Sequence, residues 1–221
     1  MSGLVLSIDQ PYATLIMAGV KRFETRPSPP NGDMRPDGVR GLPGCTVNRG
    51  DRILIASTQR PVSFADVTDL APESGERCHV CGEWYSEVYA LPDAVWAAIT
   101  PAPVCRWHGE LLCVPCADHR VARLRRGCIF GSVTVADAVQ IEEYDTCEFD
   151  ALDRHVCIGS REPLELVDHE RGDEDISDQL PLGDWQRGRW AWELVDPRPF
   201  DAPVPVVGRQ GVWRWNGEVR P

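Results

Sequence analysis

Short apolar segments separated by long polar loops are the feature that most constrains the fold of this chain. One short helix is predicted after the first segment, because apolar residues between Tyr12 and Gly19 recur at helical spacing. Having so few helices leaves most of the core to strands, which disfavours a doubly wound α/β sheet. The sequence therefore predicts an α+β, mainly β protein with a small mixed or barrel-like sheet. The expected strands are residues 4–8, 22–26, 52–57 (buried on both sides), 128–135, 190–195 and 212–215.

The size and composition of the chain fit one domain that carries an insertion. It has 221 residues, of which 43% are hydrophobic, enough for a core. No apolar run approaches the roughly 20 residues that a membrane helix needs, and the N-terminus does not resemble a signal peptide. We therefore expect a cytoplasmic protein with no membrane partner. Nine cysteines, an odd number, argue against a complete disulfide framework and point to metal binding.

The net charge of −11 is concentrated in one acidic stretch. Residues 142–179 hold 14 acidic and 3 basic residues, so the rest of the chain is neutral overall. Because a neutral body can still carry a local basic face, composition does not exclude a nucleic-acid binder. Charge-rich segments commonly bury too little to fold, so residues 142–180 are expected to form a solvated acidic loop or insertion. The alternative is that this stretch mimics nucleic acid or binds a protein partner.

Lys21 is the one lysine among 23 basic residues. Together, Lys21, Glu24 and Arg26 place two cations around one carboxylate, and Glu24 and Arg26 share one side of the expected strand. The cluster could bind a phosphate through the cations while Glu24 accepts from a base amino group. It could equally use Glu24 as a base with Lys21 as stabiliser, or form an internal ion-pair network. Gln10 and Tyr12 could add a hydrogen bond and a stacking face, although Tyr12 fits the core equally well.

The segments around this cluster resemble ASCH domains, which belong to the PUA-like superfamily. The similar segments are residues 6–16, the G-x-K-x-x-E-x-R string at 19–26, and residues 52–57, 127–133, 190–194 and 208–213. The resemblance implies a small PUA-like β-barrel with a packed helix and a cleft lined by the G-x-K-x-x-E-x-R string. Family members are generally proposed to bind RNA or modified nucleotides in that cleft. The similar segments add Ser57, Arg209 and Gln210 to the candidate nucleic-acid-binding residues. This domain is expected to comprise residues 1–61, 127–141 and 181–221.

One branch of this family hydrolyses the acetyl amide of acetylcytidine with a lysine, a threonine and a glutamate. Lys21 matches that lysine. Glu24 stands where the threonine is expected, and Thr25 is displaced by one position, which turns its side chain to the other face of a strand. The resemblance therefore implies a nucleotide-binding cleft more directly than an amidohydrolase site.

Two C-x-x-C pairs lie in the interval that splits the ASCH-like pattern, which we expect to be an insertion spanning residues 62–126. Four thiolates in two such pairs match a tetrahedral zinc-ribbon site. The predicted cofactor is a structural zinc rather than a catalytic one, because four good ligands leave no open position. The ligands are predicted to be Cys78, Cys81, Cys113 and Cys116, with Cys105, His108 and His119 as alternatives.

A dense basic patch follows the second cysteine pair. Four arginines, Arg120 and Arg123 among them, lie between His119 and residue 127. Because arginine suits bidentate phosphate contacts, this element could track a nucleic-acid backbone beside the metal site. The alternative is an amphipathic helix with Val121 and Leu124 inward and the arginines merely solvated.

Three functions are compatible with these features. We favour a module that binds RNA or a modified nucleotide, because the segment around Lys21 offers recognition groups without a clear nucleophile beside a base. The first alternative is a hydrolase acting on RNA or a modified nucleoside, with Lys21 and Glu24 as its catalytic residues. The second alternative is a protein-interaction adaptor that works through the zinc insert and the acidic segment.

Overall fold

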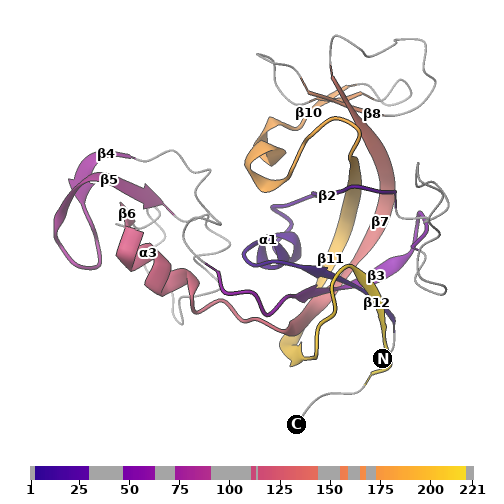
Figure 1. The fold of residues 1–221 in the computed structure, drawn as a ribbon, viewed down its shortest axis with the longest axis horizontal. Coiled ribbons are helices and arrows are strands. Elements are labelled where there is room, and N and C mark those ends of the chain that lie inside the picture. The colour runs from indigo at the N-terminus through magenta and orange to yellow at the C-terminus, as the bar shows by residue number, and fades with distance from the viewer. Residues whose placement is uncertain are drawn as a thin grey trace.

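Two separate sheets make up the structure, a computed structural model that describes residues 3–29, 47–62, 73–90, 111–112, 114–143, 155–158, 165–167 and 173–217 (Figure 1). The larger sheet, with α1 (Tyr12–Met17) and the 3-10 helix η4 (Ser177–Leu182), forms what we call the body. Its strands are β1 (Gly3–Ile8), β2 (Phe23–Arg26), β3 (Arg52–Ser57), β7 (Cys128–Glu143), β8 (His155–Ile158), β9 (Glu165–Val167), β10 (Glu174–Asp175), β11 (Trp190–Pro205) and β12 (Val212–Trp215). The smaller sheet and one helix form the cysteine lobe, which consists of β4 (Glu73–Arg77), β5 (Trp84–Ala90), β6 (Leu111–Leu112) and α3 (Val114–Val121).

The body sheet runs in the order β10-β9-β8-β7-β3-β1-β12, with β11 pairing with both β7 and β2. All six expected strands are present, and the α+β, mainly β class is confirmed. Strands β7 and β11, of 16 residues each, are much longer than expected. Over the described residues, the two ends of this strand order do not join, so the sheet stays open and no closed barrel forms. The reason is that β7 passes from β3 to β8 along its length, and β8 to β10 continue outward instead of closing on β12.

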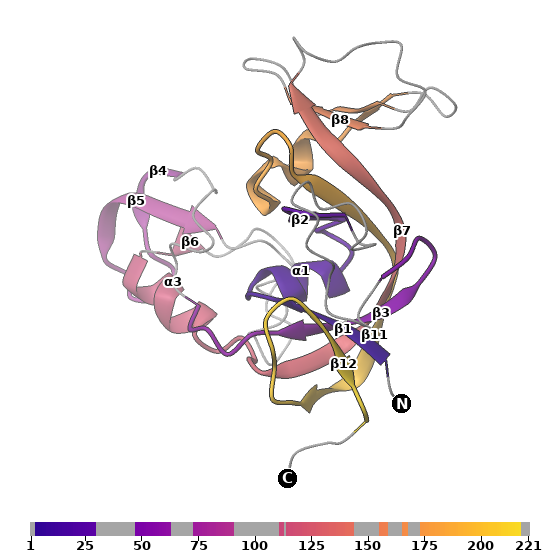
Figure 2. The same ribbon diagram turned by 45° about the vertical axis from the view of Figure 1, so that its right-hand side comes forward.

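Apolar side chains on alternate positions of the central strands fill two layers of core. On β3, Ile53 and Ile55 enter one cluster, and Leu54 and Ala56 enter another on the opposite face. The expectation that residues 52–57 are buried on both sides is therefore confirmed for 53–57. Helix α1 covers the first cluster with Ala13 and its neighbours, and the sheet curves around it (Figure 2).

Gly131 on β7 lies where three elements approach one another. A Cβ atom at this position would come within 2.3 Å of the Arg198 carbonyl oxygen on β11 and 2.8 Å of the Met17 sulfur on α1. Such distances are far inside van der Waals contact, so only glycine fits here without a shift of the backbone. Gly131 thereby allows α1 and β11 to pack closely on β7.

The acidic segment contributes structure to the body, which corrects the expectation of a solvated loop. Its described parts include β8, β9 and β10, which extend the main sheet from β7. Val156, Leu166 and Ile176 are buried in a cluster with Phe23 and Trp185, and Cys157 on β8 is disulfide-bonded. Adjacent buried residues, Val156 and Cys157 on β8 and Leu166 and Val167 on β9, let short strands form here. Residues 173–175, Asp178 and Leu180 are exposed, as expected of a solvated segment, and residues 144–154, 159–164 and 168–172 lie outside the described part of the structure.

The cysteine lobe is inserted between β3 and β7. In it β4 pairs antiparallel with β5, and β5 with β6. Both views place the lobe to one side of the body sheet (Figures 1 and 2). Among the described residues, no helix combines the length and apolar character needed to cross a membrane.

Candidate functional site

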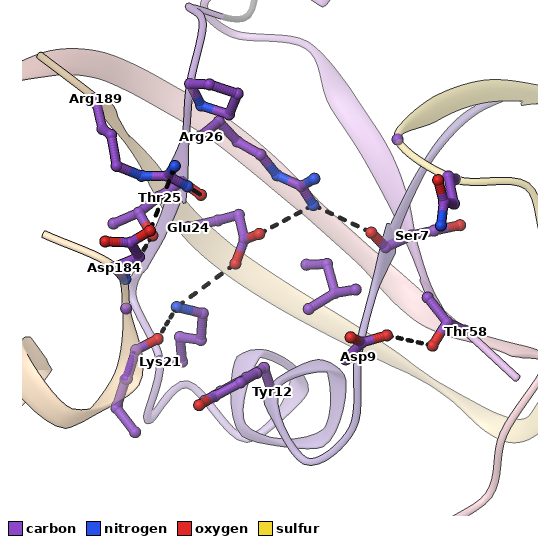
Figure 3. Close-up of a pocket in the computed structure, with 16 residues that line it drawn as sticks. Ser7, Asp9, Tyr12, Lys21, Glu24, Thr25, Arg26, Thr58, Asp184 and Arg189 are labelled. Carbon is purple, nitrogen blue, oxygen red and sulfur yellow. Dashed lines mark hydrogen bonds and ion pairs between the residues drawn. The ribbon is translucent and has the colours of Figure 1, made fainter. Parts of the chain in front are cut away.

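A pocket of about 590 Å³ opens in the body where β1, α1, β2 and the segment after η4 meet (Figure 3). Six of the side chains that line it are ionisable acids and bases, three acidic and three basic, and Tyr12 adds an aromatic ring. A cavity of this size with a few convergent polar groups is the usual form of a ligand site. The lining residues are Ser7, Ile8, Asp9, Tyr12, Lys21, Glu24, Thr25, Arg26, Pro27, Thr58, Leu182, Gly183, Asp184, Arg189, Gln210 and Gly211.

Lys21 reaches the pocket because of how α1 ends. Gly19 has φ +75°, the left-handed conformation in which glycine commonly ends a helix, and its amide donates to the Ile16 carbonyl at 3.0 Å. The amide of Lys21 then donates to the Leu15 carbonyl at 3.2 Å, which turns the chain back toward the sheet. The side chain of Lys21 is only 2% exposed as a result.

The ammonium group of Lys21 has three kinds of neighbour. Its Nζ lies 3.5 Å from Glu24 Oε2, donates to the Leu182 carbonyl and sits 5.3 Å from the centre of the Tyr12 ring. Burial lowers the pKa of Lys21 below its usual value of 10.5; the ion pair with Glu24 partly offsets this, and Arg26 adds to it. The one lysine of the chain is therefore a desolvated cation at the wall of a pocket.

Glu24 joins the two cations of the cluster. Its Oε1 lies 2.9 Å from Arg26 Nη2, which also donates to the Ser7 carbonyl at 3.1 Å (Figure 3). The carboxylate is buried and paired on both oxygens, so it holds Lys21 and Arg26 in place and leaves the trio with one net positive charge. Such an arrangement can present fixed donors to an anion or to a carbonyl oxygen of a ligand.

A second wall of the pocket comes from residues that the sequence did not indicate. Thr25 lies on the other side of β2 from Glu24, as alternation predicts, and its Oγ1 accepts from the Asp184 amide at 2.9 Å. Arg189 donates from Nη2 to the Thr25 carbonyl at 3.2 Å, and its Nη1 lies 3.4 Å from Asp184 Oδ2. Pairing of β2 with β11 brings these positions together. No local motif marks them.

The third wall lies at the carboxyl ends of the parallel strands β1 and β3. Asp9 follows β1 and Thr58 follows β3; Thr58 Oγ1 donates to Asp9 Oδ1. Asp9 Oδ2 also lies 2.9 Å from Arg60 Nη1. The sequence analysis missed both residues, and the available signal was that each directly follows a buried parallel strand, where ligands often bind.

The structure places the predicted nucleic-acid-binding residues in three different settings. Tyr12, Lys21, Glu24, Arg26 and Gln210 line the pocket. Arg209 is exposed and outside the lining.

The third setting is the interior, which holds Gln10 and Ser57. Gln10 Nε2 donates to the Arg125 carbonyl at 2.9 Å, and its Oε1 accepts from the amide of Thr14 at 3.2 Å. Ser57 Oγ donates to the same Arg125 carbonyl at 3.3 Å. With both side chains buried and bonded to the protein, neither is presented to a ligand.

The predicted basic patch combines a buried apolar side with an exposed basic one. Val121 and Leu124 are buried, which confirms the amphipathic pattern, while Arg123 is exposed and its Nη2 lies 3.3 Å from His119 Nε2. The side chain of Arg120 is outside the described part of the structure. Exposed arginines on such an element remain available to a polyanion.

The cysteine lobe brings three of the four predicted metal ligands together. The sulfur atoms of Cys78, Cys81 and Cys116 all lie within 4.8 Å of one another. Gly82, with φ +75°, donates its amide to the Cys78 carbonyl at 2.8 Å, so residues 78–82 form a tight turn. Cys113, Cys105 and His108 lie outside the described residues, and His119 is not part of the group. The three cysteines could hold a metal ion.

Comparison of the sequence with protein-family models finds no matching family, and a search of curated proteins finds no match either.

Proposed function

We propose that this protein binds RNA, or a modified nucleotide, in the pocket built around Lys21, Glu24 and Arg26. The observation that carries the proposal is the pocket itself, in which fixed cations and carboxylates surround one aromatic side chain. Nucleobases present both donors and acceptors on their edges and a flat face, so a ligand of this kind matches such a mixed lining. The resemblance to ASCH domains supports the same proposal.

Three of the side chains that line the pocket have distinct roles in this proposal. Arg26 contacts a phosphate or a carbonyl oxygen, because its guanidinium is held by Glu24 yet remains partly exposed. The ring of Tyr12 offers a stacking face beside the Lys21 ammonium. Asp184 accepts from an exocyclic amino group or a ribose hydroxyl, since its carboxylate is about half exposed at the rim. Arg120, Arg123, Arg209 and Gln210 extend the contact to the backbone of a longer strand.

The finer identity of the fold and of the metal belongs to the same proposal. We assign the body to a PUA-like architecture in an opened form, with residues 62–126 as its insertion. We assign a structural zinc to Cys78, Cys81, Cys113 and Cys116. A zinc ion with bonds of about 2.3 Å to four thiolates holds the sulfur atoms about 3.8 Å apart, which fits a trio already within 4.8 Å.

A second candidate function is hydrolysis of RNA or a modified nucleoside. It is favoured by the lowered pKa of Lys21, because a desolvated amine next to a carboxylate is a common catalytic pair. Lys21 and Glu24 would then be the catalytic residues. The third function, a protein-interaction adaptor through the zinc insert and the acidic segment, remains a prediction. Deleting residues 142–180 to test it would also remove β8, β9 and β10 from the body, so the deletion would change the stability of the body as well.

The experiment that tests the proposal compares two arginine variants. Arg26→Gln removes a cation from the pocket, whereas Arg198→Gln removes an exposed cation paired with Asp196 away from it. Affinity for a short fluorescent single-stranded RNA is measured by anisotropy at two salt concentrations. We expect Arg26→Gln to weaken binding at least about tenfold, equivalent to about 1.4 kcal/mol, and Arg198→Gln to leave it within about twofold. Equal affinities for both variants would contradict a role for the pocket.

A parallel assay separates binding from catalysis. Wild type and Lys21→Met are incubated with acetylated cytidine and with RNA, and products are quantified. Methionine is chosen because it preserves the length of the buried stem, whereas arginine would need space that a 2% exposed side chain does not have. Turnover by the wild type that disappears in Lys21→Met would establish the hydrolase and displace the binding module.

A further inference from the structure

One backbone carbonyl, that of Arg125, joins the end of the cysteine lobe to the body. It accepts hydrogen bonds from Gln10 Nε2 at 2.9 Å and from Ser57 Oγ at 3.3 Å. Gln10 is 2% exposed and Ser57 is fully buried, so both donors are shielded from water where they bond to this carbonyl. The amide of Cys128 donates in turn to Ser57 Oγ at 3.4 Å, which continues the connection into β7.

Each of the two donors is the sequence neighbour of a pocket residue. Gln10 follows Asp9, and Ser57 precedes Thr58; Asp9 and Thr58 line the pocket and are hydrogen-bonded to each other. The amide of Gly127 donates to the Thr58 carbonyl at 3.1 Å, so the end of the lobe also holds this residue through its backbone. The junction with the lobe therefore sets the position of the third wall of the pocket.

Gln10 connects this junction to α1 as well. Its Oε1 accepts from the amide of Thr14 at 3.2 Å and from Thr14 Oγ1 at 3.0 Å. The side chain thus uses donor and acceptor at once, joining the Arg125 carbonyl to the first turn of the helix that carries Tyr12. A buried amide bonded on both sides has little freedom to relax when one partner moves.

On the lobe side, a short segment leads from a metal ligand to the same carbonyl. Cys116 lies on α3, which ends at Val121, and the amide of Leu124 donates to the Val121 carbonyl at 3.0 Å. Val121 and Leu124 are both buried, so the tail of the helix is anchored before it reaches Arg125. Metal sites of this kind fold with their ion, which means that the position of α3 depends on occupancy of the cysteine site.

We infer that Gln10 is a positioning residue through which occupancy of the cysteine site and occupancy of the pocket favour each other. This inference rests on the proposed function. With the cysteine site filled, α3 and its tail fix the Arg125 carbonyl, and Gln10 and Ser57 hold Asp9, Thr58 and the start of α1 in the binding arrangement. With the site empty, the carbonyl is released and the third wall loosens.

Linkage makes this inference quantitative, because the two sites must affect each other by the same factor. The affinity for the short single-stranded RNA is measured with zinc bound and after removal of zinc by a chelator. Zinc affinity is then measured by chelator competition with and without the RNA. We expect both affinities to change by the same factor, at least about fivefold.

Matched variants identify the route of the coupling. Gln10→Met and Ser57→Ala each remove a donor to the Arg125 carbonyl and should reduce the coupling factor to below about twofold. Ser132→Ala is the control: Ser132 is also a buried serine, but its hydroxyl accepts from Arg52 Nη1 at 2.8 Å, away from the junction. Ser132→Ala should keep the full coupling factor of the wild type. A factor that survives in both Gln10→Met and Ser57→Ala would overturn the route.

Hydrogen exchange gives a readout that needs no ligand. Removing zinc from the wild type should speed exchange of the amides of residues 9–15 at least about fivefold, because the first turn of α1 loses its anchor. In Ser57→Ala and Gln10→Met these amides should respond less than about twofold. If RNA fails to bind the zinc-loaded wild type, the proposed function fails while this arm still tests the link. If RNA binds equally with and without zinc and exchange is unchanged, the inference fails and the proposed function stands.

Discussion

The body and the cysteine lobe are stabilised in different ways. Three clusters of buried side chains hold the body, drawn from every long strand and from α1. In the described part of the lobe and its tail, the buried residues are Cys78, Val121 and Leu124, while Trp84 is 64% exposed. Among the described residues, the cysteine trio could add to this burial by holding a metal ion, which is the usual source of stability for a module with a small apolar core. The proposed zinc would therefore give the lobe the stability that burial gives the body.

Loss of a cysteine ligand should have the largest effect, and it should be confined to the lobe. Cys78→Ser removes the buried member of the trio, so zinc affinity should fall by about a hundredfold or more and the amides of β4 and β5 should lose protection from exchange. The amides of β1 and β3 should keep their protection from exchange. Exchange measured by mass spectrometry, with and without zinc, checks this result.

Cys128→Ser is the control, because Cys128 lies on β7 in the body and outside the cysteine trio. Its zinc affinity should equal that of the wild type. If β4 and β5 stay protected in Cys78→Ser, or after chelation of the wild type, then the lobe has its own sufficient core and the contrast between the two regions disappears.

Gly131→Ala provides the opposite experiment, a change confined to the body. The new methyl group would meet the Arg198 carbonyl and the Met17 sulfur, so the free energy of unfolding of the body should fall by about 1–3 kcal/mol. Zinc affinity should be unchanged. Urea denaturation followed by tryptophan fluorescence measures the first quantity and chelator competition the second.

Gly3→Ala is the matched control for this change. A Cβ at Gly3 would contact the Leu54 side chain at 3.6 Å, an ordinary distance, and stability should stay within about 0.5 kcal/mol of the wild type. Equal stability of the two variants would show that β7, β11 and α1 pack less closely than described.

The smallest effect concerns the one buried cation of the pocket. Because the pKa of Lys21 is lowered in the folded state, the unfolded chain binds more protons than the folded chain between that pKa and 10.5. The free energy of unfolding must therefore increase as pH rises across this window, by at most about 1.4 kcal/mol per pH unit. Lys21→Met lacks this gain, so the difference in stability between wild type and variant should shift in favour of the wild type as pH rises. If the urea midpoints of wild type and Lys21→Met differ by the same amount at every pH, that result contradicts the lowered pKa of Lys21.

Local patterns predicted the parts of the fold that depend on short stretches of chain. Strands β3 and β12 begin and end where expected, because each is a compact run of apolar residues. Strand β11 was cut short in the prediction, because Pro197, Pro199 and Pro203 indicate a loop; the observed strand accommodates them through shifts in register against β7. Strands β8, β9 and β10 of the acidic segment were missed because its few apolar residues are diluted by charge.

The candidate site shows the same difference between residues that local patterns predict and residues that long-range pairing brings together. Lys21, Glu24 and Arg26 are close in sequence, so their spacing and strand alternation predicted that they lie together. Asp9 and Thr58 meet through parallel pairing of β1 with β3, and Thr25 and Arg189 through pairing of β2 with β11. No single-sequence pattern reports such pairings. Gln10 was expected to contact a ligand, and only the position of the Arg125 carbonyl shows that it is already engaged.

The insertion of the lobe between two neighbouring strands has a consequence for how the chain assembles. Strands β3 and β7 pair directly, yet roughly 70 residues, 58–127, separate their paired ends, and closing a loop of that length costs about 2 kcal/mol more than closing a tight turn. The ends of the inserted segment lie together, since the Gly127 amide donates to the Thr58 carbonyl at 3.1 Å. An insertion that has already folded would therefore act on the sheet as a short turn does. The order of folding therefore matters: a lobe that closes first removes most of the entropic penalty for the central strand pairing, and a metal-depleted chain should form its sheet more slowly.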